Sequence, residues 1–314
     1  MMRPVRAFVA VTDREWFEFL RARPDIDELN FWQPSGGRRF GAVGVGELLL
    51  FKLHAPAKAI VGGGTFLWAD SFPAWLAWEA FEEKNGATSF EQMRQRIQRY
   101  RRQPISATGV EEVGCIVVGE PFFFDEAEWI EQPADWSPNI VRGKTYSDAT
   151  PEGRALLAEV VLRSEAITSV RKGAAATEIL GPVFGEPGLA RRRLGQGAFK
   201  LIVLDAYERR CAVTGEKALP VLQAAHIKPV ASGGLHQLLN GLLLRSDVHT
   251  LFDKGYVTIT PDDRFRVSQR LRSDFDNGEH YFALERSAVQ MPGQPERRPS
   301  RDNLEWHNDM VFLG

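Results

Sequence analysis

Cysteine is scarce in this chain of 314 residues, which has only Cys115 and Cys211. The two lie far apart in the sequence, so we do not expect a disulfide framework. The count alone excludes a structural zinc site built from four cysteines. Apolar cores and hydrogen bonds must therefore hold the fold together.

Long apolar runs are also missing from the sequence. No stretch reaches the roughly 18 consecutive apolar residues that a membrane-spanning helix needs. The first residues, MMRPVRAFVAVTDREW, lack the extended apolar segment of a secretory signal peptide. We therefore expect a cytoplasmic protein without a membrane partner.

Neither sign of charge dominates, since 39 Lys and Arg residues stand against 41 Asp and Glu residues. The local balance differs: residues 191–254 carry 10 basic and 5 acidic side chains, and residues 91–103 carry five arginines and one glutamate. Basic segments in a nearly neutral chain are compatible with nucleic-acid binding, although they do not establish it.

The length favours two domains, and the residue patterns place them. Residues 1–140 combine β-prone runs such as AFVAVT and ELLLFKLH with helical spacing in TDREWFEFLRAR, where Thr12 or Asp13 is the candidate N-cap. The glycines at 62–64 favour a bulge or tight turn over a phosphate-binding loop, because no strand–loop–helix pattern surrounds them. Residues 141–190 are rich in loop-forming residues and predict a linker with one helix. Residues 191–314 form the second predicted domain.

The segment from Ala224 to Phe252, AAHIKPVASGGLHQLLNGLLLRSDVHTLF, places single polar residues among apolar ones. Buried polar groups cost free energy unless they find partners or perform chemistry. The pattern predicts a strand ending at His226, a loop closed by Asn240 and a short helix. On that helix His249 and Asp253 are four residues apart, so they share a face and can chelate one divalent cation.

This arrangement of His226, Asn240, His249 and Asp253 resembles the ββα-metal finger of the HNH endonucleases, over roughly residues 191–260. The resemblance implies that His226 is the general base and that Asn240 braces the loop. It also implies that His249 and Asp253 bind the metal, and that the products carry 5′-phosphate and 3′-hydroxyl ends. An imidazole with a pKa of about 6.5 suits the first role. Three further histidines, His54, His236 and His280, receive no role.

One position departs from the family pattern. Many HNH members carry a metal-binding Asp or His directly before the catalytic histidine, where this chain has Ala225. Fewer protein ligands leave more water on the cation, which favours Mg²⁺ or Mn²⁺ over tightly held Zn²⁺.

The order of elements in the first domain, with its segment LNFWQPSGGRRF, resembles the PUA-like superfamily of EVE, ASCH and SRA-type domains. The resemblance implies an α+β chain with an N-terminal β-barrel flanked by helices. Such domains often hold a flipped, modified base, which needs stacking faces and hydrogen bonds to its edge. The candidate residues are Phe31, Trp32, Phe66 and Trp68 as walls, with Trp32 expected in a loop, and Asn30 and Gln33 as readers of the edge. A place in the hydrophobic core is the alternative for each aromatic residue.

Arginines supply candidate contacts to DNA phosphates. They are Arg94, Arg96 and Arg99 on a predicted helix and Arg193 in a basic loop. A solvated helix face is the alternative for the first three.

A base-reading domain joined to a nuclease finger resembles the modification-dependent restriction endonucleases, with double-stranded DNA carrying modified bases as the partner. Cutting both strands with one finger per chain requires either a homodimer or two successive nicks. Two alternatives stay open at this point. One is a non-specific or toxin-type HNH DNase, and the other is a reader of modified DNA whose finger has lost catalysis.

Overall fold

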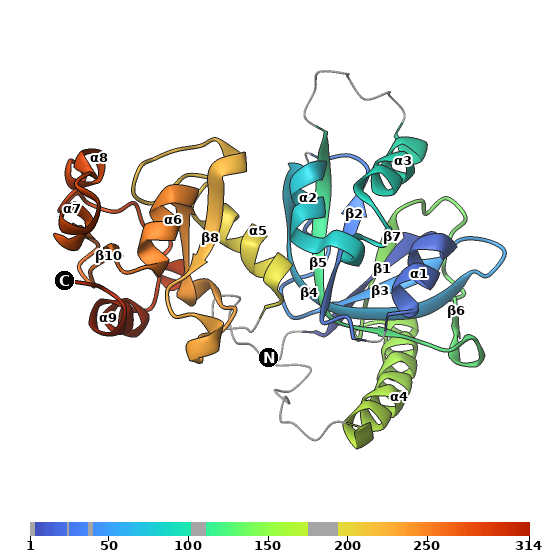
Figure 1. Cartoon of the computed structure of the whole chain (residues 1–314). Coiled ribbons are helices and arrows are strands. Elements are labelled where there is room, and N and C mark those ends of the chain that lie inside the picture. The colour runs from blue at the N-terminus through green and yellow to red at the C-terminus, as the bar shows by residue number, and fades with distance from the viewer. Residues whose placement is uncertain (1–3, 24, 37–39, 102–110, 175–193) are drawn as a thin grey trace. The chain divides into compact units, whose positions relative to one another are not determined.

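The computed structural model describes residues 4–23, 25–36, 40–101, 111–174 and 194–314. The chain folds into two compact units, Met1–Glu186 and Pro187–Gly314 (Figure 1). Within the described residues, no helix has the length and hydrophobicity that crossing a membrane requires.

A mixed sheet forms the centre of the first unit, with strand order β2-β5-β4-β3-β1-β7 and with β6 paired to β4. The β1–β3 pair is parallel and the other pairs are antiparallel. The strands are β1 (Arg6–Thr12), β2 (Glu28–Gln33), β3 (Leu48–Leu53), β4 (Ala59–Pro73), β5 (Glu112–Phe123), β6 (Ile130–Glu131) and β7 (Gly143–Ser147). The helices are α1 (Arg14–Arg21), α2 (Ala74–Phe81), α3 (Phe90–Tyr100) and α4 (Pro151–Ala174).

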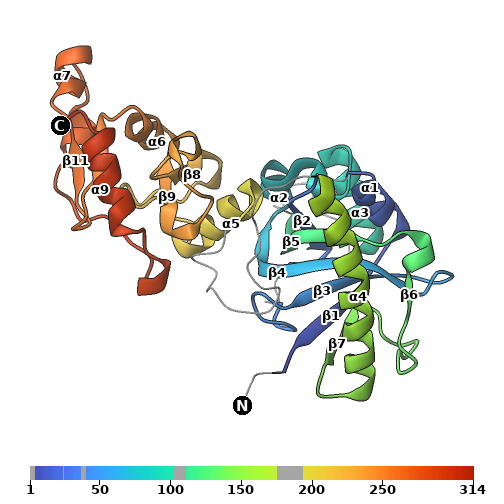
Figure 2. The same cartoon turned by 90° about the horizontal axis from the view of Figure 1, so that it is seen from below.

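Both faces of the central strands are buried, which explains their continuous apolar sequences. On one face Val9 and Leu50 join a core with Leu157 and Val160 of α4, and Figure 2 shows α4 crossing the strands. On the other face the ring of Phe51 packs edge-on against Trp16 of α1, with centroids 5.2 Å apart. The sheet with helices on its faces gives the α+β class that the sequence predicts.

Two expectations for local structure are confirmed. The side chain of Asp13 caps α1 by accepting a hydrogen bond of 2.7 Å from the backbone N–H of Trp16. The glycines at 62–64 lie within β4, whose pairing with β5 shifts register between Gly63 and Thr65. A Cβ on Gly64 would lie 2.8 Å from the carbonyl oxygen of Gly119, so the close strands require a glycine there.

The predicted linker at 141–190 requires correction. Strand β7 pairs with β1, and Tyr146 of β7 is buried in the same core as Leu156 and Leu157 of α4. The loop-forming residues of this segment suggested a linker, but its strand and helix complete the sheet and cover one face. The division between the two units, after Glu186, lies outside the described residues.

The second unit contains two hairpins and five helices among its described residues. The strands are β8 (Leu222–His226), β9 (Gly241–Arg245), β10 (Val257–Ile259) and β11 (Phe265–Val267). The helices are α5 (Gln196–Ala206), α6 (Ser246–Asp253), α7 (Arg270–Phe275), α8 (Glu279–Phe282) and α9 (Arg301–Met310). Helix α6 ends at Asp253, and Gly255, two residues later, adopts a left-handed φ of 76°, as glycines commonly do just after a helix.

A buried histidine links α9 to the finger in the second unit. His307 is 1% exposed and stacks on Phe252, the penultimate residue of α6, with centroids 3.6 Å apart. Its Nε2 donates to the carbonyl oxygen of Phe252 at 3.1 Å, so its Nδ1 accepts from the Thr258 hydroxyl at 2.8 Å. Burial lowers the pKa of His307 to about 4, because the charged imidazolium is poorly solvated there.

Candidate active site

The two arms of a hairpin and one helix form the finger that the sequence predicts. Strands β8 and β9 pair antiparallel, with His226 opposite Gly241 and Leu222 opposite Arg245. Helix α6 follows β9 without a gap, so the chain turns directly from the second strand into the helix that carries His249.

The imidazole of His226 is fixed on one face and at one edge. Its ring stacks on Phe199 of α5, with centroids 4.1 Å apart and planes 11° from parallel. Its Nε2 lies 3.0 Å from Nδ1 of His236. Burial first, and then the charges of His236 and His249 when protonated, lower the pKa of His226 to about 4. His226 is therefore neutral near pH 7, as a general base must be.

A glycine opposite His226 makes room for the stacking ring. A Cβ at Gly241 would lie 2.6 Å from Cγ2 of Val203 and 3.1 Å from Cε2 of Phe199. Any side chain at this position would push α5 away from β9. The Asn-Gly pair therefore shapes the site as well as closing the loop.

Asn240 braces the loop between the two strands, as the sequence predicts. Its Oδ1 accepts from the backbone N–H of Lys228 at 2.9 Å. Its Nδ2 donates to the carbonyl oxygens of Lys228 at 2.8 Å and Leu235 at 3.0 Å. The side chain is buried and ties the residues that follow His226 to the residue before His236.

His249 and Asp253 share one face of α6, with His249 Nε2 3.3 Å from Asp253 Oδ2. Nδ1 of His249 lies 2.7 Å from Oε1 of Gln223 on β8. An amide oxygen only accepts, so Nδ1 carries the proton and Nε2 keeps its lone pair. Burial lowers the pKa of His249, which keeps Nε2 able to bind a cation at neutral pH.

This donor pair fits a hard divalent cation. Neighbouring ligands of an octahedral Mg²⁺, at about 2.1 Å from the ion, lie about 3 Å apart. The 3.3 Å between His249 Nε2 and Asp253 Oδ2 is close to that spacing. The part of the chain that the structure describes contains no group of three or more His, Cys, Asp or Glu side chains able to hold a metal. Ala225 is fully buried and offers no ligand, so water and phosphate oxygens would complete the shell.

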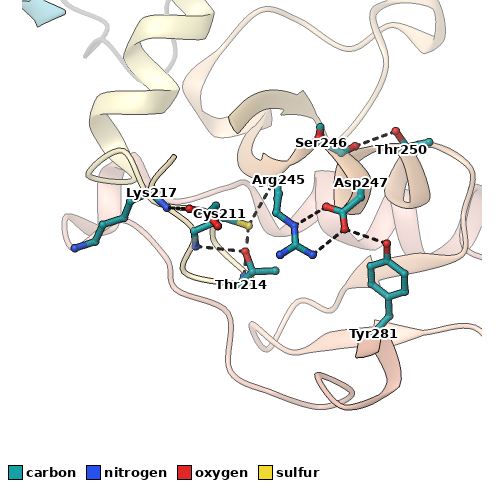
Figure 3. A network of polar contacts seen from close by, with 9 residues as sticks. Cys211, Thr214, Lys217, Arg245, Ser246, Asp247, Thr250 and Tyr281 are labelled. Carbon is teal, nitrogen blue, oxygen red and sulfur yellow. Dashed lines mark hydrogen bonds and ion pairs between the residues drawn. The ribbon is translucent and has the colours of Figure 1, made fainter. Parts of the chain in front are cut away.

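Apolar packing and a polar network hold the finger. The packing comes from Leu201, Ile202, Leu204, Leu242, Leu244, Leu251 and Phe252. Of these, all but the half-buried Leu251 are at most 1% exposed. Figure 3 shows the polar network: Arg245 donates to both carboxylate oxygens of Asp247 at 2.7 Å, and the Tyr281 hydroxyl donates to Asp247 at 3.0 Å. The buried Sγ of Cys211 accepts the backbone N–H of Arg245 at 3.2 Å. The network joins the end of β9 to α6 and α8.

The candidate base-reading residues lie mostly inside the first unit. Their exposed fractions are 0% for Asn30, 8% for Phe31, 9% for Trp32, 5% for Phe66 and 7% for Trp68, and Gln33 is half-buried. The expectation of a loop around Trp32 is wrong, because the residue lies on β2, paired with Cys115. Every residue of β2 except the half-buried Gln33 is buried, in contrast to the exposure that the polar neighbours of Trp32 suggested. The Trp32 indole N–H donates to the carbonyl oxygen of Asn85 at 3.0 Å.

The candidate phosphate contacts are mostly occupied within the protein. Arg94 pairs with Glu111 at 3.3 Å, and the buried Arg96 pairs with Glu15 at 3.5 Å and donates to the carbonyl oxygen of Gly86. Arg99 pairs with Glu15 at 3.7 Å, yet its side chain is 64% exposed. Arg193 lies outside the described residues. Of the three described arginines, Arg99 has the most exposed side chain.

A cavity of about 250 Å³ opens next to these arginines. It is lined by Asp13, Arg14, Glu15, Arg96, Arg99 and Tyr100. The ring of Tyr100 lies 6.4 Å from that of Trp32. The sequence missed this cavity, because its lining comes from the start of α1 and the end of α3, which are distant in the chain.

Comparison with known families decides the identity of the finger. Residues 211–260 match the family described as HNH endonuclease. This segment is an HNH nuclease domain. It contains His226, Asn240, His249 and Asp253, the four residues that carry the resemblance in the sequence.

Solved structures supply further likenesses. "Modification dependent TagI restriction endonuclease" matches at 23% identity with a TM-score of 0.27, over 37% of this chain and 38% of that chain. This chain thus spans about 38% of that relative. An ASCH protein from Zymomonas mobilis matches at 12% identity with a TM-score of 0.32, over 48% of this chain and 94% of that chain. A single-residue mutant of the same protein matches at 11% identity with a TM-score of 0.31, over 49% and 97% of the two chains. No curated protein sequence matches the chain.

Three residues that contact the HNH site escaped the sequence reasoning. His236 was set aside as a loop residue, although the loop folds back onto His226. Gln223 and Phe199 carry no recognisable motif. The sequence offers one usable signal for Gln223, which is the exposed polar residue of β8.

Proposed function

We propose that this chain is a divalent-metal-dependent DNA endonuclease whose cleavage is directed by a modified base. The observation that carries the proposal is the arrangement of the HNH domain. A neutral, immobilised imidazole on β8 and a His249–Asp253 pair on α6 belong to one hairpin–helix unit, and His249 is close enough to His226 to lower its pKa.

His226 acts as the general base in this proposal. A neutral imidazole nitrogen takes a proton from water while the water oxygen attacks the phosphorus atom. Asn240 and Phe199 hold the loop and the ring in place, so little motion is needed during the step. The departing oxygen is the 3′ oxygen, which leaves 5′-phosphate and 3′-hydroxyl ends.

His249 and Asp253 would hold the metal ion, Mg²⁺ or Mn²⁺. When bound, such an ion supplies Lewis-acid stabilisation of charge on the phosphate and on the leaving oxygen. Gln223 fixes His249 in the tautomer whose Nε2 binds the ion, as partners of metal-binding histidines commonly do.

The first unit supplies the base reader in this proposal. The cavity has one aromatic ring in its lining, that of Tyr100, whose centroid lies 6.4 Å from that of the buried Trp32. Its lining carboxylates and arginines offer hydrogen bonds to the edge of a base. Arg99 is exposed beside it and can neutralise a phosphate. The buried Phe31 packs against Trp16 of α1, the helix whose first residues line the cavity, whereas Phe66 packs against Phe40 and Trp68 against Phe72.

A digestion panel tests the proposal. The full chain is incubated with matched plasmids that carry cytosine, 5-methylcytosine, hydroxymethylcytosine, glucosylated hydroxymethylcytosine or phosphorothioate linkages, with Mg²⁺, Mn²⁺ or EDTA. We expect cleavage of at least one modified plasmid, none of the unmodified plasmid and none in EDTA. Accumulation of nicked circles before linear product would indicate successive nicks, whereas direct linearisation would indicate a homodimer.

Two other outcomes would replace the proposal. Equal cleavage of modified and unmodified plasmids would make the chain a non-specific HNH DNase. Tight binding to modified DNA without cleavage under any metal condition would make it a reader with an inactive finger.

A further inference from the structure

The contact between His226 and His236 is an unassigned feature of the HNH domain. Nε2 of His226 and Nδ1 of His236 are 3.0 Å apart, a hydrogen-bond distance. The two rings meet edge to face, with centroids 4.8 Å apart and planes at 71°. A hydrogen bond of this kind needs one proton between two ring nitrogens, so one histidine donates and the other accepts.

The direction of the hydrogen bond follows from the proposed role of His226 as general base. Its Nε2 is already engaged by His236, so only Nδ1 remains to receive a proton from water. Nδ1 can receive that proton only when it is bare, which places the ring proton of His226 on Nε2. Nε2–H must then donate, and Nδ1 of His236 must accept.

We propose that His236 is a positioning residue of the nuclease, whose Nδ1 accepts the hydrogen bond from His226 Nε2–H and keeps His226 Nδ1 bare and aimed at the attacking water. The inference rests on the proposed function of His226 as general base. His236 plays the orienting part that a third group plays in other base-activated sites, here as a neutral acceptor.

The loop around His236 is built to hold this geometry. The carbonyl oxygen of His236 accepts the backbone N–H of Leu194 at 2.7 Å. The carbonyl oxygen of the preceding Leu235 accepts from Asn240 Nδ2 at 3.0 Å. Phe199 touches both imidazoles, with centroids 4.1 Å from His226 and 5.9 Å from His236. Backbone anchors on both sides and a shared aromatic ring restrict both imidazoles to one arrangement.

The proton balance of the step is simple. The water O–H bond breaks and its proton binds Nδ1 of His226, while the water oxygen bonds to phosphorus and the bond to the 3′ oxygen breaks. His226 becomes an imidazolium whose Nε2–H still donates to His236, now as a stronger, charge-assisted hydrogen bond. His236 itself neither gains nor loses a proton.

Nitrogen NMR tests the tautomer without any substrate. The full chain, which has six histidines, is labelled with ¹⁵N-histidine, and the His226 signals are assigned with a His226→Asn variant. At pH 7 we expect His226 to show a protonated Nε2 and a bare Nδ1. The opposite tautomer of His226 would overturn the proposal, whether or not the protein cleaves DNA.

Matched variants test the positioning role through cleavage. Asn places an oxygen where His236 has Nδ1, whereas Leu has a similar size but no acceptor. His236→Leu should lower the single-turnover cleavage rate by about 10- to 100-fold, and His236→Asn should recover most of it. DNA binding measured in Ca²⁺ should not change in either variant. His54→Leu, at an exposed position, serves as the control.

Two results would contradict the positioning role. Equal rates for His236→Leu and His236→Asn would show that the acceptor does not matter. Recovery of the His236→Leu rate at raised Mn²⁺ concentration would make His236 a metal ligand. A cleavage failure of the wild-type chain on every DNA would refute the proposed function instead, and the NMR result would still decide the tautomer.

Discussion

Gly241 lies directly opposite His226 in the β8–β9 hairpin, and its lack of a side chain leaves the space in which Phe199 stacks on the imidazole. The missing side chain at Gly241 thereby helps to set the orientation of the His226 imidazole. The same glycine follows Asn240 in the chain. Gly241 leaves room for Phe199 beside the His226 ring, and Asn240 holds the loop that follows His226.

The first prediction concerns this close approach. Gly241→Ala should force Val203 and Phe199 to shift, because the new Cβ would lie 2.6 Å and 3.1 Å from them. We expect a loss of about 1–3 kcal/mol in unfolding free energy, together with slower cleavage. Gly293→Ala is the control, since a Cβ there meets nothing within 4 Å. Denaturant unfolding of both variants checks this, and equal stabilities would contradict it.

The second prediction concerns the brace. Asn240→Ala removes partners from the backbone N–H of Lys228 and from two carbonyl oxygens. Leaving such buried groups unpaired should cost about 1–3 kcal/mol, and the loosened loop should slow cleavage while metal affinity stays constant. Asn139→Ala, at an exposed position, is the matched control. A variant as stable as the control would show that the loop does not depend on Asn240.

The third prediction concerns metal binding. Gln223→Leu removes the acceptor that fixes the His249 tautomer, and should weaken Mn²⁺ binding by about 10- to 100-fold. Asp253→Asn should weaken it as well, because a carboxylate ligand is lost. Calorimetric titration of the full chain with Mn²⁺ measures both effects, with the exposed Gln98→Leu as control. Unchanged affinity in both variants would place the metal elsewhere.

The fourth prediction concerns acid stability. The pKa of His307 is about 4 when folded and about 6.5 when unfolded, so the unfolded chain binds the proton more tightly. His307 therefore contributes to the free energy of unfolding in full above pH 6.5. The contribution is lost as the pH falls toward 4, by up to about 3 kcal/mol at 1.36 kcal/mol per pKa unit. The melting temperature should therefore fall less between pH 7.5 and pH 5 in His307→Gln than in the wild type. The same difference in both proteins would exclude His307 as the cause.

The sequence predicts the finger well, because its information is local. His249 and Asp253 share a helix face by spacing alone, and His226 ends a strand whose partner begins right after Asn240. His236 was missed for the opposite reason. Its contact with His226 depends on how an irregular loop folds back, and no periodicity encodes that path.

The first domain is harder to predict at the level of single residues. Its strands were recognisable. Aromatic residues on a strand, however, look alike in sequence whether they line a pocket or the core. Phe31, for example, packs against Phe51 in the core. The supposed linker likewise carries turn-forming residues that precede β7 and α4. Only the pairing of β7 with β1, and the burial of α4 in the core that contains Leu50, show that both elements belong to the domain.

The most direct test of the account is the single-turnover cleavage rate of His226→Ala on the modified DNA that the wild type cuts, measured beside its affinity for that DNA in Ca²⁺. The account predicts unchanged affinity and a rate lower by about 10²- to 10⁴-fold, the usual contribution of a general base. Cleavage by His226→Ala at the wild-type rate would contradict it.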